Sequence, residues 1–325
     1  EKAKNAAQRL VAQEKDLVGG MGAWLSSFTL AVTEVTERER VPWLSLSYSD
    51  QITERGFKYV FQTSVTAAAQ AKETFPLVLK LAETATGKRP TRVGVIHDNT
   101  ASPMSFIKPM REGGFQQLGL TPVVDEIFTP PLSDATPLVQ KLRNTRPEFA
   151  FINPTAIPDL KLLLEKINEL GLGQGKLPLV GNGALAGTPD LLTALTPEQL
   201  EGYLVGMGNW PGKQQQQLVE RFKKRYPSEP WLIQDTMTSY GHVWILKEAL
   251  EKAGVADREK VAAAIRAMDI SSGPVAESFS GGRVKFDERG RREGAIMPII
   301  QWQKGVPVTV FPADVAVTQP LWPKQ

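Results

Sequence analysis

The chain has 325 residues, of which 42% are hydrophobic and 22% charged, the balance of a globular protein long enough for two domains. It contains no cysteine and only two histidines, which excludes disulfides, thiolate metal sites, thiol nucleophiles and histidine-rich metal centres. The formal net charge of +3 is distributed along the chain, so we expect no nucleic-acid partner.

Residues 3–14 form an amphipathic helical pattern, and strand and helix patterns then alternate up to residue 180. The predicted strands cover residues 16–18, 42–46, 92–96, 121–125, 149–152 and 177–180. The predicted helices between them cover residues 27–38, 67–86, 103–117, 135–144 and 157–170. Such alternation predicts parallel sheets built from right-handed strand–helix–strand units.

After residue 208 helical patterns dominate, and they cover residues 213–225, 235–253 and 257–268. An extended stretch at 283–286 leads into a turn at 287–290, which indicates a hairpin. The last predicted strands are residues 298–302 and 306–311. We find no internal repeat and no apolar run of about 20 residues, the length needed to cross a bilayer.

Five predicted strands run into loops that combine glycine, small hydroxyl residues and a few aromatic residues. These loops cover residues 20–24, 47–50, 97–102, 153–155 and 181–184. In open α/β sheets, ligands bind outside the carboxyl ends of the strands, where such loops gather. Backbone amides and Ser or Thr hydroxyls at helix N-termini suit a carboxylate. We therefore expect a small-molecule site formed by these loops.

Three motifs suggest other chemistry, and each has a simpler interpretation. His97-Asp98 ends a strand like a catalytic dyad, but the sequence offers no nucleophile for it, so we expect a structural role. Gly19-Gly20-Met21-Gly22 lacks both the glycine spacing and the acidic residue of a dinucleotide site. His242 lies in an apolar helical pattern, where a packed histidine is expected. We therefore expect no cofactor, and an α/β enzyme is the least supported class.

The sequence resembles the periplasmic solute-binding proteins of the branched-chain amino acid (leucine/isoleucine/valine-binding) type, which serve ABC importers. The resemblance covers almost the whole chain and rests on the order and spacing of several strings. They are Ala7-Gln8-Arg9-Leu10-Val11, Val18-Gly19-Gly20-Met21, Val41-Pro42-Trp43-Leu44-Ser45, Ser47-Tyr48-Ser49, Ile52-Thr53-Glu54-Arg55-Gly56, Tyr59-Val60-Phe61-Gln62-Thr63-Ser64, Val93-Gly94-Val95-Ile96-His97-Asp98, Leu200-Glu201-Gly202 and residues 282–290.

The resemblance implies the type I periplasmic binding protein fold: an α/β protein with two Rossmann-like lobes, parallel central sheets and a hinge of three crossovers. Lobe one would comprise residues 1–90 and 210–294, and lobe two residues 91–209 and 295–325. Family members normally begin with a further strand, loop, helix and second strand. The resemblance therefore implies that such a first unit precedes residue 1.

The same resemblance implies where a ligand would bind. In relatives that bind α-amino acids, the carboxylate lies on the loops that correspond here to Ala23-Trp24 and 47–49. The backbone of Ser47 and the hydroxyl of Ser49 are the candidates. Those relatives place an acidic partner for the ammonium group where this chain has Gly183. Two further loop positions, often tyrosine in the amino-acid binders, are Ser102 and Thr155.

Aromatic side chains add to this candidate site. Trp24, Tyr48 and Trp210 lie near the expected cleft, and Trp210 is also close enough to a crossover to serve in hinge packing. Asp235 opens a predicted helix, where an N-cap is the simplest role and a position at the cleft is the alternative.

Because the usual ammonium partner is missing, we expect a small carboxylate ligand without an α-amino group, for example an aromatic acid stacked on these rings or a keto acid. A branched-chain or other hydrophobic amino acid is the alternative, and a ligand-sensing regulatory protein on the same fold is a second one. The expected partner is the membrane permease of an ABC importer, and the chain is expected to act as a monomer. We expect a periplasmic location, or an extracytoplasmic, lipid-anchored one in a Gram-positive bacterium, after removal of a signal segment.

Overall fold

The computed structural model describes residues 1–322 and divides into two compact units. The first unit comprises Glu1–Ala67 and Gly208–Met297, and the second comprises Ala68–Met207 and the chain from Pro298 onward. The chain therefore passes from one unit to the other three times. The first passage lies at residues 67 and 68, not near residue 90 as the resemblance implied, and the helix that follows belongs to the second unit.

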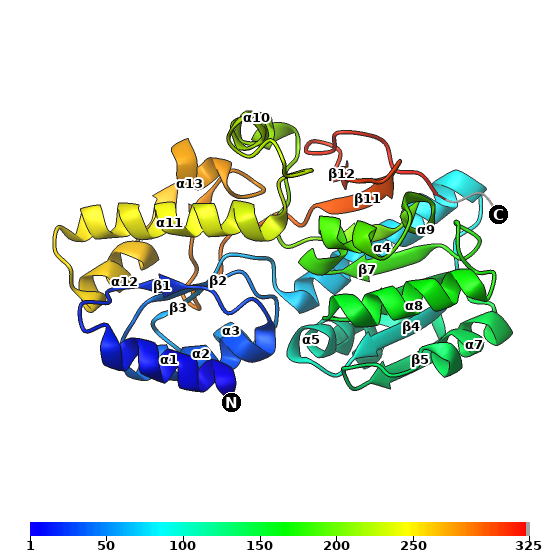
Figure 1. The fold of residues 1–325 in the computed structure, drawn as a ribbon, viewed down its shortest axis with the longest axis horizontal. Coiled ribbons are helices and arrows are strands. Elements are labelled where there is room, and N and C mark those ends of the chain that lie inside the picture. Colours follow the sequence, from blue (N-terminus) through cyan, green and yellow to red (C-terminus); the bar gives the residue numbers. More distant parts are fainter. Residues whose placement is uncertain (323–325) are drawn as a thin grey trace. The chain divides into compact units, whose positions relative to one another are not determined.

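The first unit contains a three-stranded parallel sheet with the order β1-β2-β3 (Figure 1). Its elements before residue 67 are α1 (Lys2–Gln13), β1 (Gly20–Met21), α2 (Ser26–Arg38), β2 (Trp43–Ser45), α3 (Gln51–Glu54) and β3 (Val60–Gln62). Those after residue 208 are a 3-10 turn (Lys213–Gln215), α10 (Gln216–Arg225), α11 (Gln234–Ala253), α12 (Arg258–Arg266), β9 (Asp269–Ile270), α13 (Gly273–Glu277) and β10 (Val284–Lys285).

Strand β2 shows how this sheet separates two hydrophobic cores. Successive side chains of a strand point to opposite faces. Trp43 packs with buried residues of α1 and α2, among them Val11 and Val35. Leu44 packs on the other face with α11 and α12, where Ile245 is fully buried. Helices therefore cover both faces of the sheet. The carboxyl ends of its three strands lead into the loops 22–25, 46–50 and 63–66.

The second unit contains a seven-stranded sheet with the order β12-β11-β8-β7-β6-β4-β5. Strands β8, β7, β6, β4 and β5 are parallel, and β11 and β12 are antiparallel additions at one edge. The helices and strands of this unit are α4 (Ala67–Thr86), β4 (Arg92–Asp98), α5 (Ala101–Pro109), a π-helical turn (Met110–Gly114), α6 (Phe115–Gln117), β5 (Thr121–Phe128), α7 (Thr136–Thr145), β6 (Phe149–Asn153), α8 (Ile157–Glu169), β7 (Leu179–Asn182), 3-10 turns (Ala184–Gly187, Pro189–Thr193), α9 (Pro197–Leu200), β8 (Leu204–Gly206), β11 (Ile299–Gln303) and β12 (Val306–Phe311).

Helix α4 joins the second unit through a cluster of phenylalanine rings. The ring of Phe75 lies 5.5 Å from that of Phe151 on β6 and 5.5 Å from that of Phe115 on α6. Phe106 on α5 stacks on Phe151 with ring centroids 4.6 Å apart. Aromatic rings contribute large buried areas and favour such offset and edge contacts. This packing explains why the boundary between the units precedes α4.

Several predicted elements differ from the structure. The strand predicted at 16–18 lies instead at Gly20–Met21, because β1 runs under the Trp43 ring, and a Cβ atom at residue 20 would come within 2.3 Å of that ring. The helix predicted at 103–117 is interrupted at Gly113, whose φ of 120° leaves the helical range. The three-residue strands β3 and β8 were not predicted, since such short segments carry little pattern. Within the described residues, no helix combines the length and apolar character needed to span a membrane.

The phenylalanine cluster gives a test of the second unit's core. We expect Phe75→Ala to destabilise this unit by about 3–5 kcal/mol, the usual effect of removing a buried aromatic ring. Phe28→Ala is the matched control, because Phe28 is 50% exposed, and it should change stability by less than about 0.5 kcal/mol. Urea unfolding followed by circular dichroism measures both. Equal stability of the two variants would contradict the assignment of α4 to this core.

Candidate functional site

The loops after β1 and β2 in the first unit are held together by Ser47. Its Oγ lies 3.0 Å from the carbonyl oxygen of Ala23 and 2.9 Å from that of Trp24, so these two acceptors share its single hydroxyl hydrogen. Its backbone N–H donates to Ser45 Oγ at 3.1 Å. Ala23 has a φ of 60°, uncommon for a residue with a side chain. The predicted carboxylate donor Ser47 is thus already engaged within the protein, and it positions the loop that carries Trp24.

Ser49 is also engaged inside the first unit. It is fully buried, its N–H donates to Ser26 Oγ at 3.1 Å, and its carbonyl accepts from Gln62 Nε2 at 3.2 Å. The structure therefore gives these backbone groups of Ser49 a part in fixing the loop after β2. Ser26 was not among the predicted site residues, although a serine at the first position of a helix is a common partner for backbone N–H groups.

Tyr48 is the centre of a buried hydrogen-bond network. Its hydroxyl donates to Gln234 Oε1 at 2.7 Å and accepts from the N–H of Gly208 at 3.0 Å. Only 6% of Tyr48 is exposed, and a Cβ atom at Gly208 would lie 2.4 Å from its ring. The ring therefore packs against the backbone where the chain re-enters the first unit, and it presents little surface for stacking.

Trp210 is likewise buried, with 3% of its surface exposed. Its backbone N–H donates to Ser280 Oγ at 3.3 Å, and its backbone carbonyl accepts from the same hydroxyl at 3.1 Å. Ser280 N–H in turn donates to Asn209 Oδ1 at 2.8 Å. These contacts favour the packing role for Trp210.

A buried arginine closes the same network. Arg292 Nε donates to the carbonyl of Thr63 at 2.8 Å and Nη1 to that of Ser280 at 3.0 Å. Burial lowers the pKa of Arg292 to about 10, which leaves the guanidinium charged at neutral pH. It thereby connects the end of β3 with the segment that precedes the last passage between the units.

Asp235 lies in the first turn of α11 and is not the N-cap, because the helix begins at Gln234 and Ile233 occupies the cap position. Its carboxylate accepts a hydrogen bond from the Trp24 side chain, while burial raises the pKa of Asp235 to about 6 despite that bond. The Oδ1 atom is buried without a hydrogen-bond partner. The structure thus brings Trp24 and Asp235 together within the first unit.

Gln234, which the sequence analysis did not select, supplies a second unpartnered atom. Its Oε1 accepts from Tyr48 and from the backbone N–H of Asn209 at 3.1 Å. A backbone N–H can only donate, so this contact fixes the orientation of the amide. Nε2 is then the remaining donor, and it is buried without a partner. The signal in the sequence was a glutamine directly after Leu232 and Ile233, at the start of a predicted helix.

In the second unit, Asp98 organises the candidate loops. Its Oδ1 accepts from the N–H of Thr100 at 2.9 Å and from its hydroxyl at 2.6 Å. Its Oδ2 accepts from the N–H and the hydroxyl of Thr155, both at 2.6 Å. The carboxylate therefore joins the loops after β4 and β6, and the hydroxyl of Thr155 serves this junction. Ser102 stands beside it, half-buried in the first turn of α5.

Gly183 follows β7 with φ 111° and ψ 149°, a conformation that is essentially restricted to glycine. Its N–H donates to the carbonyl of Gly206 at 2.9 Å. No atom lies within 4 Å of the position that a Cβ atom would occupy. Backbone geometry therefore explains the glycine, and this loop has no side chain at the position where the relatives' resemblance implied an acidic group.

The two histidines have structural roles, as the sequence analysis expected. His97 Nδ1 contacts the carbonyl of Asp98 at 2.7 Å, and Nε2 lies 3.0 Å from Nη2 of Arg111. Burial lowers the pKa of His97. His242 Nε2 lies 2.7 Å from Thr63 Oγ1, and burial lowers the pKa of His242 to about 3. Both rings are therefore neutral at pH 7.

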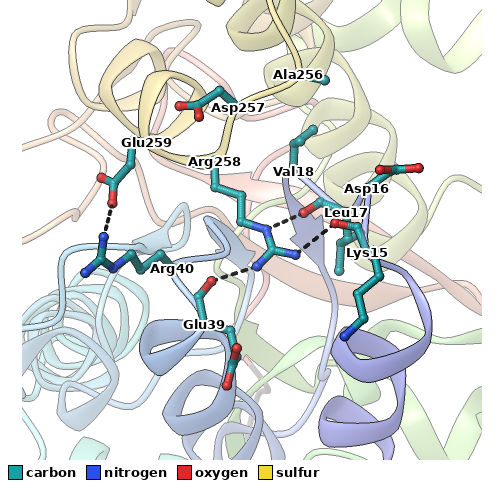
Figure 2. A pocket seen from close by; sticks show the side chains of 10 residues that line it. All are labelled: Lys15, Asp16, Leu17, Val18, Glu39, Arg40, Ala256, Asp257, Arg258 and Glu259. Carbon is teal, nitrogen blue, oxygen red and sulfur yellow. Dashed lines mark hydrogen bonds and ion pairs between the residues drawn. The ribbon is translucent and has the colours of Figure 1, made fainter.

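A hollow of about 460 Å³ in the first unit lies at the opposite ends of the strands. Figure 2 shows it between the segments 15–18 and 39–40, which precede β1 and β2, and the start of α12. Arg258 donates to the carbonyls of Leu17 at 2.7 Å and Glu39 at 2.9 Å, and Arg40 pairs with Glu259 at 3.3 Å. Because both arginines already have partners within the protein and ligands bind at carboxyl strand ends, we exclude the hollow from the candidate site. Nor does the described part of the chain contain a cluster of three metal-ligating side chains.

A family model described as periplasmic binding protein matches residues 1–306. The chain belongs to this family. The Leu/Ile/Val-binding protein homolog 8 of Brucella abortus is 27% identical over 309 residues, which cover 92% of this chain and 74% of that protein. Homolog 7 of Brucella suis is 27% identical over 322 residues, with 96% and 78% covered.

Solved structures agree on the fold. A leucine-binding protein of Thermotoga maritima superposes with a TM-score of 0.78 and 23% identity, covering 94% of this chain and 82% of that one. An ABC-transporter solute-binding protein of R. palustris in complex with benzoate gives a TM-score of 0.77 and 16% identity, with 100% and 85% covered. The chain thus has the type I periplasmic binding protein fold, and its family is one of ligand-binding receptors and not of enzymes.

The raised pKa of Asp235 predicts a pH-dependent stability difference. The unfolded chain releases this proton near pH 4 and the folded chain near pH 6. Ionised Asp235 therefore destabilises the fold increasingly as pH rises from about 4 to about 6, and constantly above. Asp235→Asn should raise the free energy of unfolding by about 2 kcal/mol at about pH 7.5 and by less at about pH 4.5. Calorimetric unfolding measures it, with the exposed Asp314→Asn as control. A gain independent of pH would contradict the burial of the Asp235 charge.

Proposed function

We propose that this receptor takes up a small organic acid without an α-amino group. The acid would bind at the carboxyl ends of the strands, and the candidate contacts in the first unit are Trp24 and the first turn of α11. In the second unit the candidate positions are the loops beside Ser102, Thr155 and Gly183. In this proposal the chain acts outside the cytoplasm, as a monomer that delivers the acid to the membrane permease of an ABC importer.

The main observation in favour of an acidic ligand is the unpartnered Nε2 of Gln234. A buried donor without an acceptor costs about 1–3 kcal/mol, and a carboxylate oxygen of the ligand would remove this cost. The same atom lies at the start of the 20-residue helix α11, where the helix dipole favours negative charge. A carboxylate there would gain from both effects.

Asp235 is compatible with an acid because burial raises the pKa of this carboxyl to about 6, so that protonating it at neutral pH costs only about 1.4 kcal/mol. A protonated Asp235 can donate a hydrogen bond to a ligand carboxylate, whereas an ionised one would repel it. The opposite requirement holds for an amino acid, whose ammonium group needs the ionised form. The state of Asp235 therefore distinguishes the two ligand classes.

The Trp24 side chain supports an acid that contains an aromatic ring. Its indole ring is half-buried, in contrast to the buried rings of Tyr48 and Trp210. A ligand ring stacked on it would gain about 0.5–1.5 kcal/mol beyond the area that it buries. The benzoate complex of the R. palustris protein shows that this fold accepts an aromatic acid.

Isothermal titration of the wild type and two variants with benzoate, phenylacetate and leucine tests the proposal. We expect one acid per chain, about tenfold weaker binding in Gln234→Leu through loss of one charge-assisted hydrogen bond, and undiminished binding in Asp235→Asn at about pH 7.5. Gln116→Leu, which changes an exposed glutamine, is the matched control. Binding of leucine with no response to either acid, and its loss in Asp235→Asn, would instead establish an amino-acid receptor.

A further inference from the structure

Two asparagines close the carboxyl ends of neighbouring strands in the second unit. Asn153 is the last residue of β6 and Asn182 the last of β7. Their exposed fractions are 3% and 6%, yet Nδ2 of Asn153 and Oδ1 of Asn182 have no hydrogen-bond partner. Buried polar atoms are rarely left unpaired in folded proteins. Two of them at adjacent strand ends point to a group that binds both.

The strand register places the two side chains next to each other. Ile152 pairs with Gly181 in the parallel β6–β7 ladder, so Asn153 and Asn182 follow as the next neighbours. Side chains two residues apart share a face of a strand. Phe151 packs on Phe75 of α4, which assigns Asn153 to the α4 face.

Asn182 lies on the same face, because its Nδ2 donates to Gln70 Oε1 of α4 at 2.6 Å. The contact that fixes its amide is a second one, from Nδ2 to the carbonyl of Gly206 at 3.2 Å. A carbonyl oxygen can only accept, so the remaining atom of Asn182 is the acceptor Oδ1. Together with Nδ2 of Asn153, the pair offers one donor and one acceptor on strands about 4.8 Å apart.

We propose that Asn153 and Asn182 form a subsite for one hydroxyl group of the bound acid. The hydroxyl oxygen would accept from Asn153 Nδ2, and its hydrogen would be donated to Asn182 Oδ1. A carboxylate cannot donate, and an ammonium group cannot accept, so neither satisfies both atoms. The subsite adjoins Gly183 in sequence and lies two residues before Thr155. It rests on the proposed function and narrows the ligand to a hydroxy acid.

Matched pairs of acids test this subsite by isothermal titration. Benzoate is compared with its 2-, 3- and 4-hydroxy derivatives, and phenylacetate with mandelate. We expect the wild type to bind at least one hydroxy acid about tenfold more tightly than its parent, the discrimination that two hydrogen bonds to buried groups provide. In Asn153→Leu, which keeps the volume and removes the donor, this ratio should fall to about 1.

Asn144→Leu, at an exposed asparagine of α7, is the control and should keep the wild-type ratio. Thermal unfolding of each variant without ligand verifies folding, and Asn153→Ala replaces Asn153→Leu if the latter does not fold. The subsite is overturned if the wild type prefers no hydroxy acid, a result that would leave a buried water as the occupant. It is also overturned if the preference for a hydroxy acid survives in the Asn153 variants. Leucine binding with no acid binding would overturn the proposed function, and the subsite with it, whereas parent acids that bind without any hydroxyl preference would overturn the subsite alone.

Discussion

The double hydrogen bond on Gln234 Oε1 is the interaction on which the first unit's candidate site depends. One oxygen accepts both from the Tyr48 hydroxyl, in the loop after β2, and from the N–H of Asn209, just after the chain re-enters the unit. Because both donors are directed at this atom, the amide cannot turn over, and its nitrogen remains the free donor. The position of α11, the burial of Tyr48 and the polarity offered to a ligand all follow from this contact.

The second unit meets the same constraint with a charged group. Buried polar groups at the ends of parallel strands must find partners or lose free energy. Asp98 satisfies four donors of Thr100 and Thr155, which holds the candidate loops after β4 and β6 in one arrangement. In each unit, therefore, most of the polar atoms near the strand ends bind one another. Several buried atoms remain unpaired, among them Nη2 of Arg292. Those on Gln234, Asp235, Asn153 and Asn182 are the ones on which the proposed ligand contacts rest.

The fold was largely predictable from the sequence, because alternating patterns of strands and helices extend over most of the chain. Prediction was poorest where a tertiary contact decides, as at β1, whose place is set by the Trp43 ring over Gly20, and at Gly113, which interrupts a continuous helical pattern. For the site, the loops were predictable from glycine and hydroxyl residues at strand ends, but the partner of each residue was not. Ser47, Tyr48 and Thr155 have the residue types of ligand contacts, yet the structure gives their hydroxyls partners within the protein. Gln234 lies some 185 residues from Tyr48 in sequence, so no local pattern could connect them.

The central claim is that the protein binds one small acid and leaves it unchanged. Native mass spectrometry tests this most directly: the purified chain is equilibrated with an isotope-labelled acid, separated from excess ligand, and weighed before and after denaturation. The account predicts a single added mass of one acid per chain, and recovery of that acid with its original mass and label. Recovery of a converted product, or retention of an amino acid in preference to any carboxylic acid, would contradict it.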